Sequence, residues 1–371
     1  MRKIKASVIR ELRGKFKTEE LYIDEPKALE VLIDVKASGL CHSDLHLVNE
    51  GFGILNQFPA VLGHEIAGVV AAVGEGVTEF KPGDHVAASL IQFCGMCEAC
   101  LSGETYYCTN RNFTLRKPDE APRLKDKADK PVFQGFGISG FSQMCLVHQN
   151  QLAKIPKEIE FSKACILGCG TITGAGAIIN TAKVRPGDAV AIIGIGGVGL
   201  NAISGARVSG ATPIIAIDVQ DEKLELAKKF GATHVINSKK EDPIKKVLEI
   251  TGGGVKAAFE VIGMKTTAEQ AIAMTKLGGG AYLIGLQDPK THVQLPGFEG
   301  FTGMGREVKG VWMGSTNIKK DIPMYAKLYL EGRMNLDDLV SKEINIDEVQ
   351  EAYENLGKGN VIGRTVITSF E

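Results

Sequence analysis

Four cysteines in a short run are the residues with the most specific chemistry in this chain. Cys94, Cys97, Cys100 and Cys108 are separated by two, two and seven residues. Four thiolates at this spacing can close a tetrahedral zinc site without a ligand from elsewhere, and they leave no position for water. The run therefore predicts a structural zinc lobe over residues 94–112. An iron–sulfur cluster or two disulfides are alternatives, but the spacing differs from that of bacterial ferredoxins, and disulfides suit a secreted chain.

A glycine-rich turn after a short apolar run indicates a second kind of site. Gly194, Gly196 and Gly199 have the spacing G-x-G-x-x-G after apolar residues 189–193, and a helical pattern of small residues follows. In dinucleotide sites these glycines permit a tight turn, close approach of backbone to a pyrophosphate, and close packing of helix on sheet. Asp218 ends the next apolar run, where an acid accepts hydrogen bonds from the adenosine ribose. The order of these features predicts a dinucleotide site. Asp218 favours NAD over NADP there, because the 2′-phosphate of NADP would meet the negative charge of Asp218.

Two further stretches concentrate side chains that bind metals or move protons. They read Cys41-His42-Ser43-Asp44-Leu45-His46 and Gly63-His64-Glu65, and a separate cysteine, Cys169, follows later. Taken singly, a buried cysteine is most often a small hydrophobe, and a lone histidine is often a core residue. That interpretation is kept for Cys145 and Cys165.

The elements that must position these residues fall into two groups. Residues 1–40 alternate apolar and polar side chains, which is typical of strands in an antiparallel, barrel-like lobe. From residue 221 to 284 helical and strand patterns alternate, ending in a helix over 266–277 and a strand over 280–284, which predicts a right-handed, mostly parallel sheet. The expected fold class is α/β, with a doubly wound Rossmann domain of residues 171–314 and a β-rich catalytic domain of residues 1–170 and 315–371.

The composition excludes several classes of partner. The 371 residues include 43 Lys and Arg against 44 Asp and Glu, so the net charge of −1 gives no electrostatic reason to bind nucleic acid or an anionic membrane. The basic N-terminus is not followed by an apolar stretch, and no run is long enough to span a bilayer. Eight cysteines without a secretory signal favour a reducing, cytoplasmic location. The charged residues 114–131, with three prolines, are expected to form a solvated loop.

Together these motifs resemble the zinc-containing medium-chain alcohol dehydrogenases over essentially the whole chain. The motifs in the family's order and spacing are Gly63-His64-Glu65-x2-Gly68, the four-cysteine lobe, Gly194-x-Gly196-Gly197-Val198-Gly199 and Gly363-Arg364. The resemblance implies a Rossmann NAD-binding domain, a GroES-like catalytic domain, and two Zn2+ per chain, one catalytic and one structural. It also implies a homodimer through the nucleotide domain, or a homotetramer.

The resemblance assigns Cys41, His64 and Cys169 as the ligands of the catalytic zinc. Two thiolates and one imidazole leave a fourth position open for water or an alcohol oxygen, and bound zinc lowers the pKa of that alcohol. Asp44 would orient the imidazole of His64, and Glu65 would lie close behind the zinc as a transient ligand.

Two residues match the family's proton path. Ser43 matches the hydroxyl that hydrogen-bonds the substrate oxygen. His46 matches the histidine that passes the proton outward by way of the nicotinamide ribose, a task that suits an imidazole.

Coenzyme contacts follow from the same resemblance. The implied contacts are His42 and Arg364 at the pyrophosphate, Lys223 at the adenosine ribose beside Asp218, Thr173 and Val198 at the nicotinamide ring, and Leu286. The substrate pocket is assigned to Leu90, Phe141 and Leu286, with Phe52 and Ile54 as further candidates, and this apolar lining favours a hydrophobic or aromatic alcohol.

Alternatives remain within and beyond this chemistry. The branch acting on glutathione-bound formaldehyde has an acid in the first pocket loop, whereas residues 51–58 of this chain contain none. That branch also has a cation just past the cysteine lobe, and Arg111 lies about one position from where that cation would align. That substrate, S-(hydroxymethyl)glutathione, is therefore disfavoured. A nicotinoprotein with permanently bound NAD(H) is a second alternative. A non-catalytic dinucleotide-binding relative is a third, although the ligand set with Asp44 and Ser43 argues against it.

Overall fold

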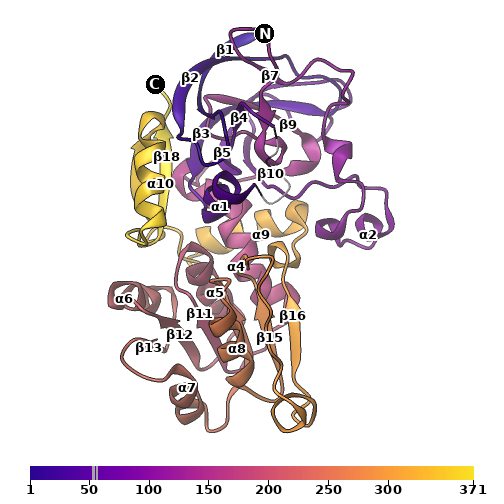
Figure 1. Cartoon of the computed structure of the whole chain (residues 1–371). Helices are drawn as coiled ribbons and strands as arrows, with labels where there is room; N and C mark the ends of the chain where they lie inside the picture. Colours follow the sequence, from indigo (N-terminus) through magenta and orange to yellow (C-terminus); the bar gives the residue numbers. More distant parts are fainter. Residues whose placement is uncertain (52–54, 56) are drawn as a thin grey trace. The chain divides into compact units, whose positions relative to one another are not determined.

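The chain divides into two compact units, each described separately (Figure 1). The computed structural model describes residues 1–51, 55 and 57–371. Unit 1 comprises residues 1–169, 317–327 and 340–371, and unit 2 comprises residues 170–316 and 328–339. The division expected from sequence placed residues 328–339 with the catalytic domain, whereas here they cluster with unit 2, where Asp338 contacts Lys229 Nζ at 2.9 Å.

Unit 1 is built on two mostly antiparallel sheets. The five-stranded sheet has the order β7-β2-β1-β4-β8, and the seven-stranded sheet has the order β10-β6-β5-β3-β18-β17, with β9 paired to β3. The strands are β1 (Arg2–Ile9), β2 (Lys17–Ile23), β3 (Glu30–Gly39), β4 (Ala60–Val61), β5 (Glu65–Val73), β6 (His85–Ala88), β7 (Leu124–Lys125), β8 (Phe133–Gln134), β9 (Met144–His148), β10 (Leu152–Lys154), β17 (Val340–Asn345) and β18 (Arg364–Ser369).

The helices of unit 1 are short and lie between these strands. They are α1 (His42–Glu50), α2 (Glu98–Leu101), α3 (Phe161–Ala164), α10 (Val349–Gly357) and α9 (Ile318–Leu330), whose last residues belong to unit 2. One-turn helices are η1 (Thr105–Tyr107), η2 (Arg111–Thr114), η3 (Gly135–Gly137), η4 (Gln149–Gln151), η5 (Cys165–Gly168) and η9 (Ile346–Glu348). The central strand β3 pairs with β5, β9 and β18, and its apolar residues are buried in the core of this unit.

Unit 2 is a parallel six-stranded sheet flanked by helices. Its strand order is β13-β12-β11-β14-β15-β16, and every neighbouring pair is parallel. The strands are β11 (Val190–Ile193), β12 (Ile214–Asp218), β13 (His234–Asn237), β14 (Val255–Glu260), β15 (Thr275–Leu283) and β16 (Glu307–Gly310). The helices are α4 (Gly170–Gly176), η6 (Ala177–Thr181), α5 (Gly197–Val208), α6 (Asp221–Phe230), α7 (Pro243–Thr251), α8 (Lys265–Ala273), η7 (Phe298–Thr302) and η8 (Met313–Ser315). The predicted doubly wound sheet is confirmed.

One predicted helix boundary is wrong. The pattern predicted a helix over 266–277, but α8 ends at Ala273 and β15 already begins at Thr275. Thr275 pairs with Val255 of β14, and the Val255 N–H donates to the Met274 carbonyl at 2.9 Å. This pairing across the sheet overrides the local helical preference of the residues.

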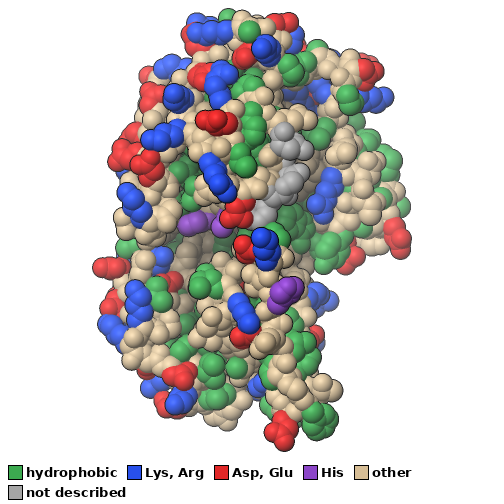
Figure 2. Space-filling model, in the orientation of Figure 1, with side chains coloured by type: hydrophobic (Ala, Val, Ile, Leu, Met, Phe, Trp, Pro, Cys, Tyr) green, Lys and Arg blue, Asp and Glu red, His purple; other side chains and the backbone are tan. Residues whose placement is uncertain are grey.

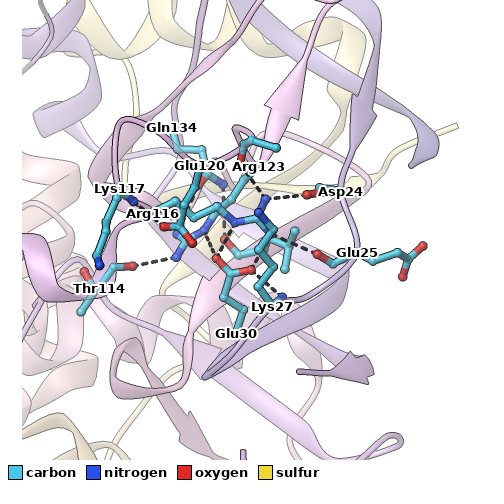
Figure 3. A network of polar contacts seen from close by, with 12 residues as sticks. Asp24, Glu25, Lys27, Glu30, Thr114, Arg116, Lys117, Glu120, Arg123 and Gln134 are labelled. Atoms are coloured by element: carbon cyan, nitrogen blue, oxygen red, sulfur yellow. Dashed lines mark hydrogen bonds and ion pairs between the residues drawn. The ribbon is translucent and has the colours of Figure 1, made fainter. Parts of the chain in front are cut away.

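Residues 114–131 are anchored, not simply solvated. The buried carboxylate of Glu30 accepts from Arg116 Nη2 at 2.6 Å and from Arg123 Nε at 2.7 Å, and Arg116 Nη1 also contacts Asp24 at 2.6 Å (Figure 3). Arg123 Nη2 donates to the Thr114 carbonyl at 2.7 Å. The two arginines therefore fix the segment to the start of β3, a relationship between distant residues that local charge patterning does not reveal.

No single helix in the described part of the chain is long and apolar enough to cross a membrane. One bent pair, residues 161–168 with 170–181, meets the length and composition limits only when the two are taken together.

Candidate active site

A cluster of metal-binding side chains forms where β3, β5 and η5 meet in unit 1. Cys41 follows β3 and precedes α1, His64 directly precedes Glu65 at the start of β5, and Cys169 caps η5. The pairing of β3 with β5 sets Gly39 opposite Glu65. Four side chains make up this cluster: Cys41, His64, Glu65 and Cys169. All four are buried, and their ligand atoms lie within 4.8 Å of one another. Residues far apart in sequence thus converge at one point, as the resemblance predicted for its zinc ligands.

The imidazole of His64 makes a hydrogen bond through only one of its two nitrogens among the described residues. Its Nδ1 lies 3.2 Å from the Asp44 carboxylate, which also accepts from the Gly63 N–H at 3.2 Å and from the Tyr353 hydroxyl at 3.3 Å. His64 Nε2 is buried and has no hydrogen-bond partner among the described residues. A metal-binding histidine needs this arrangement, with one nitrogen oriented by a carboxylate and the other available as a ligand.

Glu65 lies behind the cysteines and pairs with a buried arginine. Arg364 Nη2 donates to Glu65 Oε1 at 2.6 Å and lies 3.9 Å from Cys41 Sγ, and Nη1 donates to the Leu40 carbonyl at 3.1 Å. A Cβ at Gly39 would come within 2.5 Å of Glu65 Oε2, so the glycine makes room for this carboxylate.

The charges in this cluster shift the proton affinities of its members. Burial raises the pKa of Glu65 to about 7, against the opposing effect of Arg364. Burial opposes protonation of His64, but the Asp44 carboxylate raises the pKa of the imidazole above its usual range. The hydrogen bond between the two thiols lowers the pKa of Cys41 and raises that of Cys169.

These residues fit a zinc ion. Two thiols, one imidazole with an unbonded buried nitrogen, and a nearby carboxylate are a donor set that zinc prefers. The ligands must lose protons to bind a metal, and the hydrogen bond and Arg364 already favour the thiolate of Cys41.

Helix α1 carries the other predicted residues of unit 1. Ser43 Oγ lies 3.3 Å from Cys41 Sγ, beside the ligand cluster. His46 is half-buried and stands three residues further along the same helix, while His42 is exposed. Side chains three apart share a helix face, so Ser43 and His46 are neighbours.

The four-cysteine lobe forms a second cluster. The sulfurs of Cys94, Cys97, Cys100 and Cys108 lie within 4.8 Å of one another, and all eight cysteines of the chain are free thiols. The predicted alternative of two disulfides is therefore absent from the structure. Backbone N–H groups point at the sulfurs, including Asn110 N at 3.3 Å from Cys108 Sγ. Such hydrogen bonds, those at Cys100 and Thr109 first, lower the pKa of Cys97 to about 6.

Unit 2 presents the predicted dinucleotide features in order. Gly194 has φ +98°, and a Cβ on Gly199 would lie 2.0 Å from the Gly194 carbonyl oxygen, so the turn and the start of α5 require these glycines. Gly196 has open space around its Cα and precedes Gly197, the first residue of α5. The Asp218 carboxylate accepts from the Ile195 N–H at 2.7 Å, so the acid also holds the glycine loop.

The remaining coenzyme candidates lie in several elements. Thr173 is buried in α4 and donates to Met313 Sδ at 3.7 Å. Val198 in α5 and Lys223 in α6 are half-buried, and Leu286 is exposed. Their contacts with a coenzyme stay predictions.

Two assignments meet a different environment from the one expected. Phe141, predicted to line the substrate pocket, has no exposed surface, because it packs edge-on against Phe16 and Tyr353 in the core of unit 1. In this structure it is a core residue of unit 1. Arg364, predicted at the pyrophosphate, donates to Glu65 and to the Leu40 carbonyl, and its contact with a coenzyme stays a prediction. Leu90 is buried after β6, and Phe52 and Ile54 lie outside the described residues.

Sequence reasoning missed Tyr353. Its hydroxyl reaches Asp44 from α10, about three hundred positions later in the chain, and its ring stacks on Phe16. An isolated tyrosine in an amphipathic helix carries no signal of such a role.

On the face shown in Figure 2, side chains of both signs are interspersed, in keeping with the near-zero net charge.

Comparison with known proteins decides the family. Residues 27–157 match the alcohol dehydrogenase GroES-like domain, and residues 197–330 match the zinc-binding dehydrogenase family. An S-(hydroxymethyl)glutathione dehydrogenase from Escherichia coli O6:H1 is 40% identical over 354 residues, covering 94% of this chain and 95% of the relative. The enzyme of that name from Paracoccus denitrificans is 33% identical, with 98% and 99% covered. The chain belongs to the zinc-containing medium-chain alcohol dehydrogenase family.

Solved structures agree with this membership. The crystal structure of benzyl alcohol dehydrogenase from Acinetobacter calcoaceticus has a TM-score of 0.92 and 35% identity, with 100% of both chains covered. An alcohol dehydrogenase zinc-binding domain protein from Burkholderia ambifaria has a TM-score of 0.94 and 35% identity, with 99% of both covered. The predicted Rossmann and GroES-like fold is confirmed. The chain is therefore an oxidoreductase of the zinc-containing alcohol dehydrogenase family.

Proposed function

We propose that this dehydrogenase interconverts a primary or secondary alcohol and its aldehyde or ketone, with NAD as the second substrate. In oxidation the carbinol carbon loses hydride to C4 of the nicotinamide, and the hydroxyl proton leaves to solvent. The observation that carries the proposal is the buried set of Cys41, His64 and Cys169, in which His64 Nε2 is left for a ligand. When bound there, zinc supplies the Lewis acidity that lowers the pKa of the alcohol.

The residues of α1 handle the proton. Ser43 Oγ, 3.3 Å from Cys41 Sγ, would accept a hydrogen bond from a substrate hydroxyl held at the cluster and, as it takes that proton, give up its own hydroxyl proton toward His46. His46, on the same helix face, passes it toward solvent, because an imidazole exchanges protons near neutral pH. Asp44 and Tyr353 keep His64 in position, and Glu65 with Arg364 sets the charge behind the thiols.

The favoured substrate is a hydrophobic or aromatic alcohol. The apolar Leu90 and the similarity to benzyl alcohol dehydrogenase support this choice. S-(hydroxymethyl)glutathione is the second candidate, because both curated relatives carry that activity in their names. Against it, Arg111 points at its own lobe, with Nε donating to the Cys108 carbonyl at 3.3 Å and Nη2 to the Tyr106 carbonyl at 3.5 Å.

The deciding experiment measures zinc per chain and NAD reduction for wild type, Cys169→Ser and Cys145→Ser. Cys145 is an equally buried free thiol outside both clusters, so it is the matched control. We expect about two zinc ions and activity in wild type and Cys145→Ser, and about one zinc without activity in Cys169→Ser. Two zinc ions and full turnover in Cys169→Ser would contradict the ligand assignment.

A substrate panel separates the candidates. Benzyl alcohol, ethanol, a secondary alcohol, and formaldehyde with glutathione are compared by kcat/KM. The highest value for benzyl alcohol supports the proposal, and the highest value for the glutathione adduct establishes the second candidate. Coenzyme that stays with the protein through dialysis would identify a nicotinoprotein.

We also propose a homo-oligomer formed through unit 2. Strand β16 ends the sheet order, and the neighbouring Leu277 of β15 and Phe298 of η7 are 68% and 75% exposed. Large exposed apolar side chains beside a sheet edge favour association. Sedimentation at several concentrations measures it, and a monomer at all of them would refute it.

A further inference from the structure

Phe136 is a bulky residue in a backbone conformation that suits glycine. It lies in η3, is half-buried, and has φ +53° and ψ +20°. A left-handed backbone is an outlier for an aromatic residue. Ser139, in the same segment, has φ +62°, and its buried Oγ has no hydrogen-bond partner among the described residues. Strained backbone persists only where the surrounding structure imposes it, and it concentrates at functional sites.

The surroundings of Phe136 impose its conformation. Gln151 is fully buried, and its Nε2 donates to the Phe136 carbonyl at 3.0 Å. A Cβ on Gly135 would lie 2.7 Å from Leu62 Cδ2 and 3.1 Å from Leu62 Cα, so the chain before Phe136 runs close to that residue. Gly137, on the other side, has φ +70°. Two glycines and one buried amide thus hold the turn.

This turn brings the ring of Phe136 to a residue of the ligand cluster. Strand β8 pairs in parallel with β4 just before the turn, and the Gly140 N–H donates to the Gly63 carbonyl at 2.8 Å just after it. Between these pairings the rings of Phe136 and His64 meet edge-to-face, with centroids 5.1 Å apart and planes inclined at 70°. Aromatic rings attract one another in this arrangement.

The ring contact adds a constraint that the hydrogen bond of His64 lacks. The Asp44 carboxylate lies 3.2 Å from His64 Nδ1 and so fixes one atom of the imidazole. A single hydrogen bond leaves the plane of a ring free to tilt about it, whereas a second ring packed against that plane opposes the tilt. The direction of Nε2, the nitrogen left for a metal, depends on this plane.

We propose that Phe136 is a positioning residue for His64, which fixes the tilt of the imidazole and so aims Nε2 at the metal. The strained backbone is retained because it presents the ring to His64. Side chains behind a ligand tune metal affinity through such orientation. The inference rests on the proposed zinc site of Cys41, His64 and Cys169.

The test measures how tightly the catalytic zinc is held. Phe136→Leu keeps an apolar side chain but loses the ring, and its zinc is titrated against a chromophoric chelator. Cys169→Ser, expected to keep only the zinc of the four-cysteine lobe, is the reference from which catalytic zinc is counted. We expect Phe136→Leu to hold the catalytic zinc about threefold to tenfold more weakly than wild type, which is the size of an edge-to-face pair.

The matched control is a second pair of the same kind. Phe113, also half-buried, meets the buried ring of His148 edge-to-face with centroids 5.4 Å apart, and neither residue belongs to a metal-binding cluster. Phe113→Leu loses a comparable ring contact and should hold both zinc ions as wild type does.

A spectroscopic signature separates positioning from packing. With Co2+ in place of zinc, the visible absorption of the bound metal reports the arrangement of its ligands, and subtraction of the Cys169→Ser spectrum isolates the catalytic site. These bands should shift in Phe136→Leu and stay in place in Phe113→Leu. Phe136→Gly is a second variant that the left-handed backbone favours. It removes strain and ring together, so it should also weaken zinc binding and shift the bands.

Each other outcome overturns a defined statement. Wild-type zinc affinity and cobalt bands in Phe136→Leu and Phe136→Gly would refute the proposal. Equal weakening in Phe113→Leu, or of both zinc sites in Phe136→Leu, would also refute it, because either shows a general loosening of unit 1. If Phe136→Leu does not fold, Phe136→Gly decides by the same two measurements. A wild type with zinc in the four-cysteine lobe alone refutes the proposed function before any variant is compared, and this inference falls with it.

Discussion

Arg364 Nη2 donates to Glu65 Oε1 over 2.6 Å, with both side chains buried behind the thiols of the ligand cluster. The pair joins β18, near the end of the chain, to β5. Arg364 also lowers the pKa of Cys41, after the larger effect of the Cys169 hydrogen bond. One arginine thus balances the charge of a carboxylate and stabilises a thiolate.

Removing this arginine should destabilise unit 1 strongly. Arg364→Met leaves Glu65 buried without a partner, and breaking a buried ion pair costs about 3–5 kcal/mol. Urea unfolding measures the loss. Lys246→Met breaks an exposed pair with Glu249 and should cost under about 1 kcal/mol. The double variant Arg364→Met, Glu65→Gln should recover part of the loss, and strictly additive costs would show that the two residues do not interact.

Asp44 should control zinc affinity through His64. In Asp44→Asn the negative charge at His64 Nδ1 is lost, so the catalytic site should bind zinc about 10–100-fold more weakly, as for other residues that support metal-binding histidines. The fraction of zinc that the protein keeps in competition with a chromophoric chelator measures this affinity. Tyr353→Phe removes one 3.3 Å hydrogen bond to Asp44 but leaves the negative charge of Asp44, so it should weaken zinc binding less than Asp44→Asn does. Wild-type retention in Asp44→Asn would show that His64 needs no such support.

Glu30 should make stability depend on acid pH. Burial opposes ionisation, but Arg116 and Arg123 outweigh it and lower the pKa of Glu30 to about 2, from 4.5. The folded pKa lies below the unfolded one, so this stabilisation is complete above about pH 4.5 and is lost as the pH falls toward 2.

Glu30→Gln removes that dependence along with the ion pairs. At pH 7 it should unfold at lower urea than wild type, and the difference should shrink as the pH falls from 4.5 toward 2. Glu20→Gln, which breaks exposed pairs with Lys3 and Lys127, should behave like wild type because solvent screens them. A constant difference at every pH would show that Glu30 acts by packing alone.

The features that sequence predicted well are those with local spacing. The four-cysteine run and the G-x-G-x-x-G turn each carry their geometry within a few residues, and the structure shows both. Alternating patterns likewise predicted the parallel sheet, because period and order determine it. The convergence of Cys41, His64 and Cys169 came from family resemblance, since no local pattern links residues so far apart.

What the sequence could not show depends on pairings at long range. Arg116 and Arg123 look like members of a solvated charged loop until Glu30 is seen between them. Phe141 is an apolar residue whose place in the core, and not at a pocket surface, depends on Phe16 and Tyr353. Glu260 is unremarkable as the last residue of a strand, and the hydrogen bonds that its buried carboxylate accepts from Ile262, Gly263 and Thr267 depend on how the chain turns after β14.

Asp218 should set the choice of coenzyme. Its carboxylate accepts from Ile195 N and Val219 N, each at 2.7 Å, and so stays fixed at the end of β12. A 2′-phosphate there would lie a few ångströms from a like charge. The repulsion between two such charges is about 1 kcal/mol in water and about 4 kcal/mol near a protein surface. Asp218→Ser should therefore raise the ratio of kcat/KM for NADP to that for NAD by about tenfold or more. Asp221→Asn, at an exposed acid of α6, should leave that ratio unchanged. An unaltered preference for NAD in Asp218→Ser would place the determinant elsewhere.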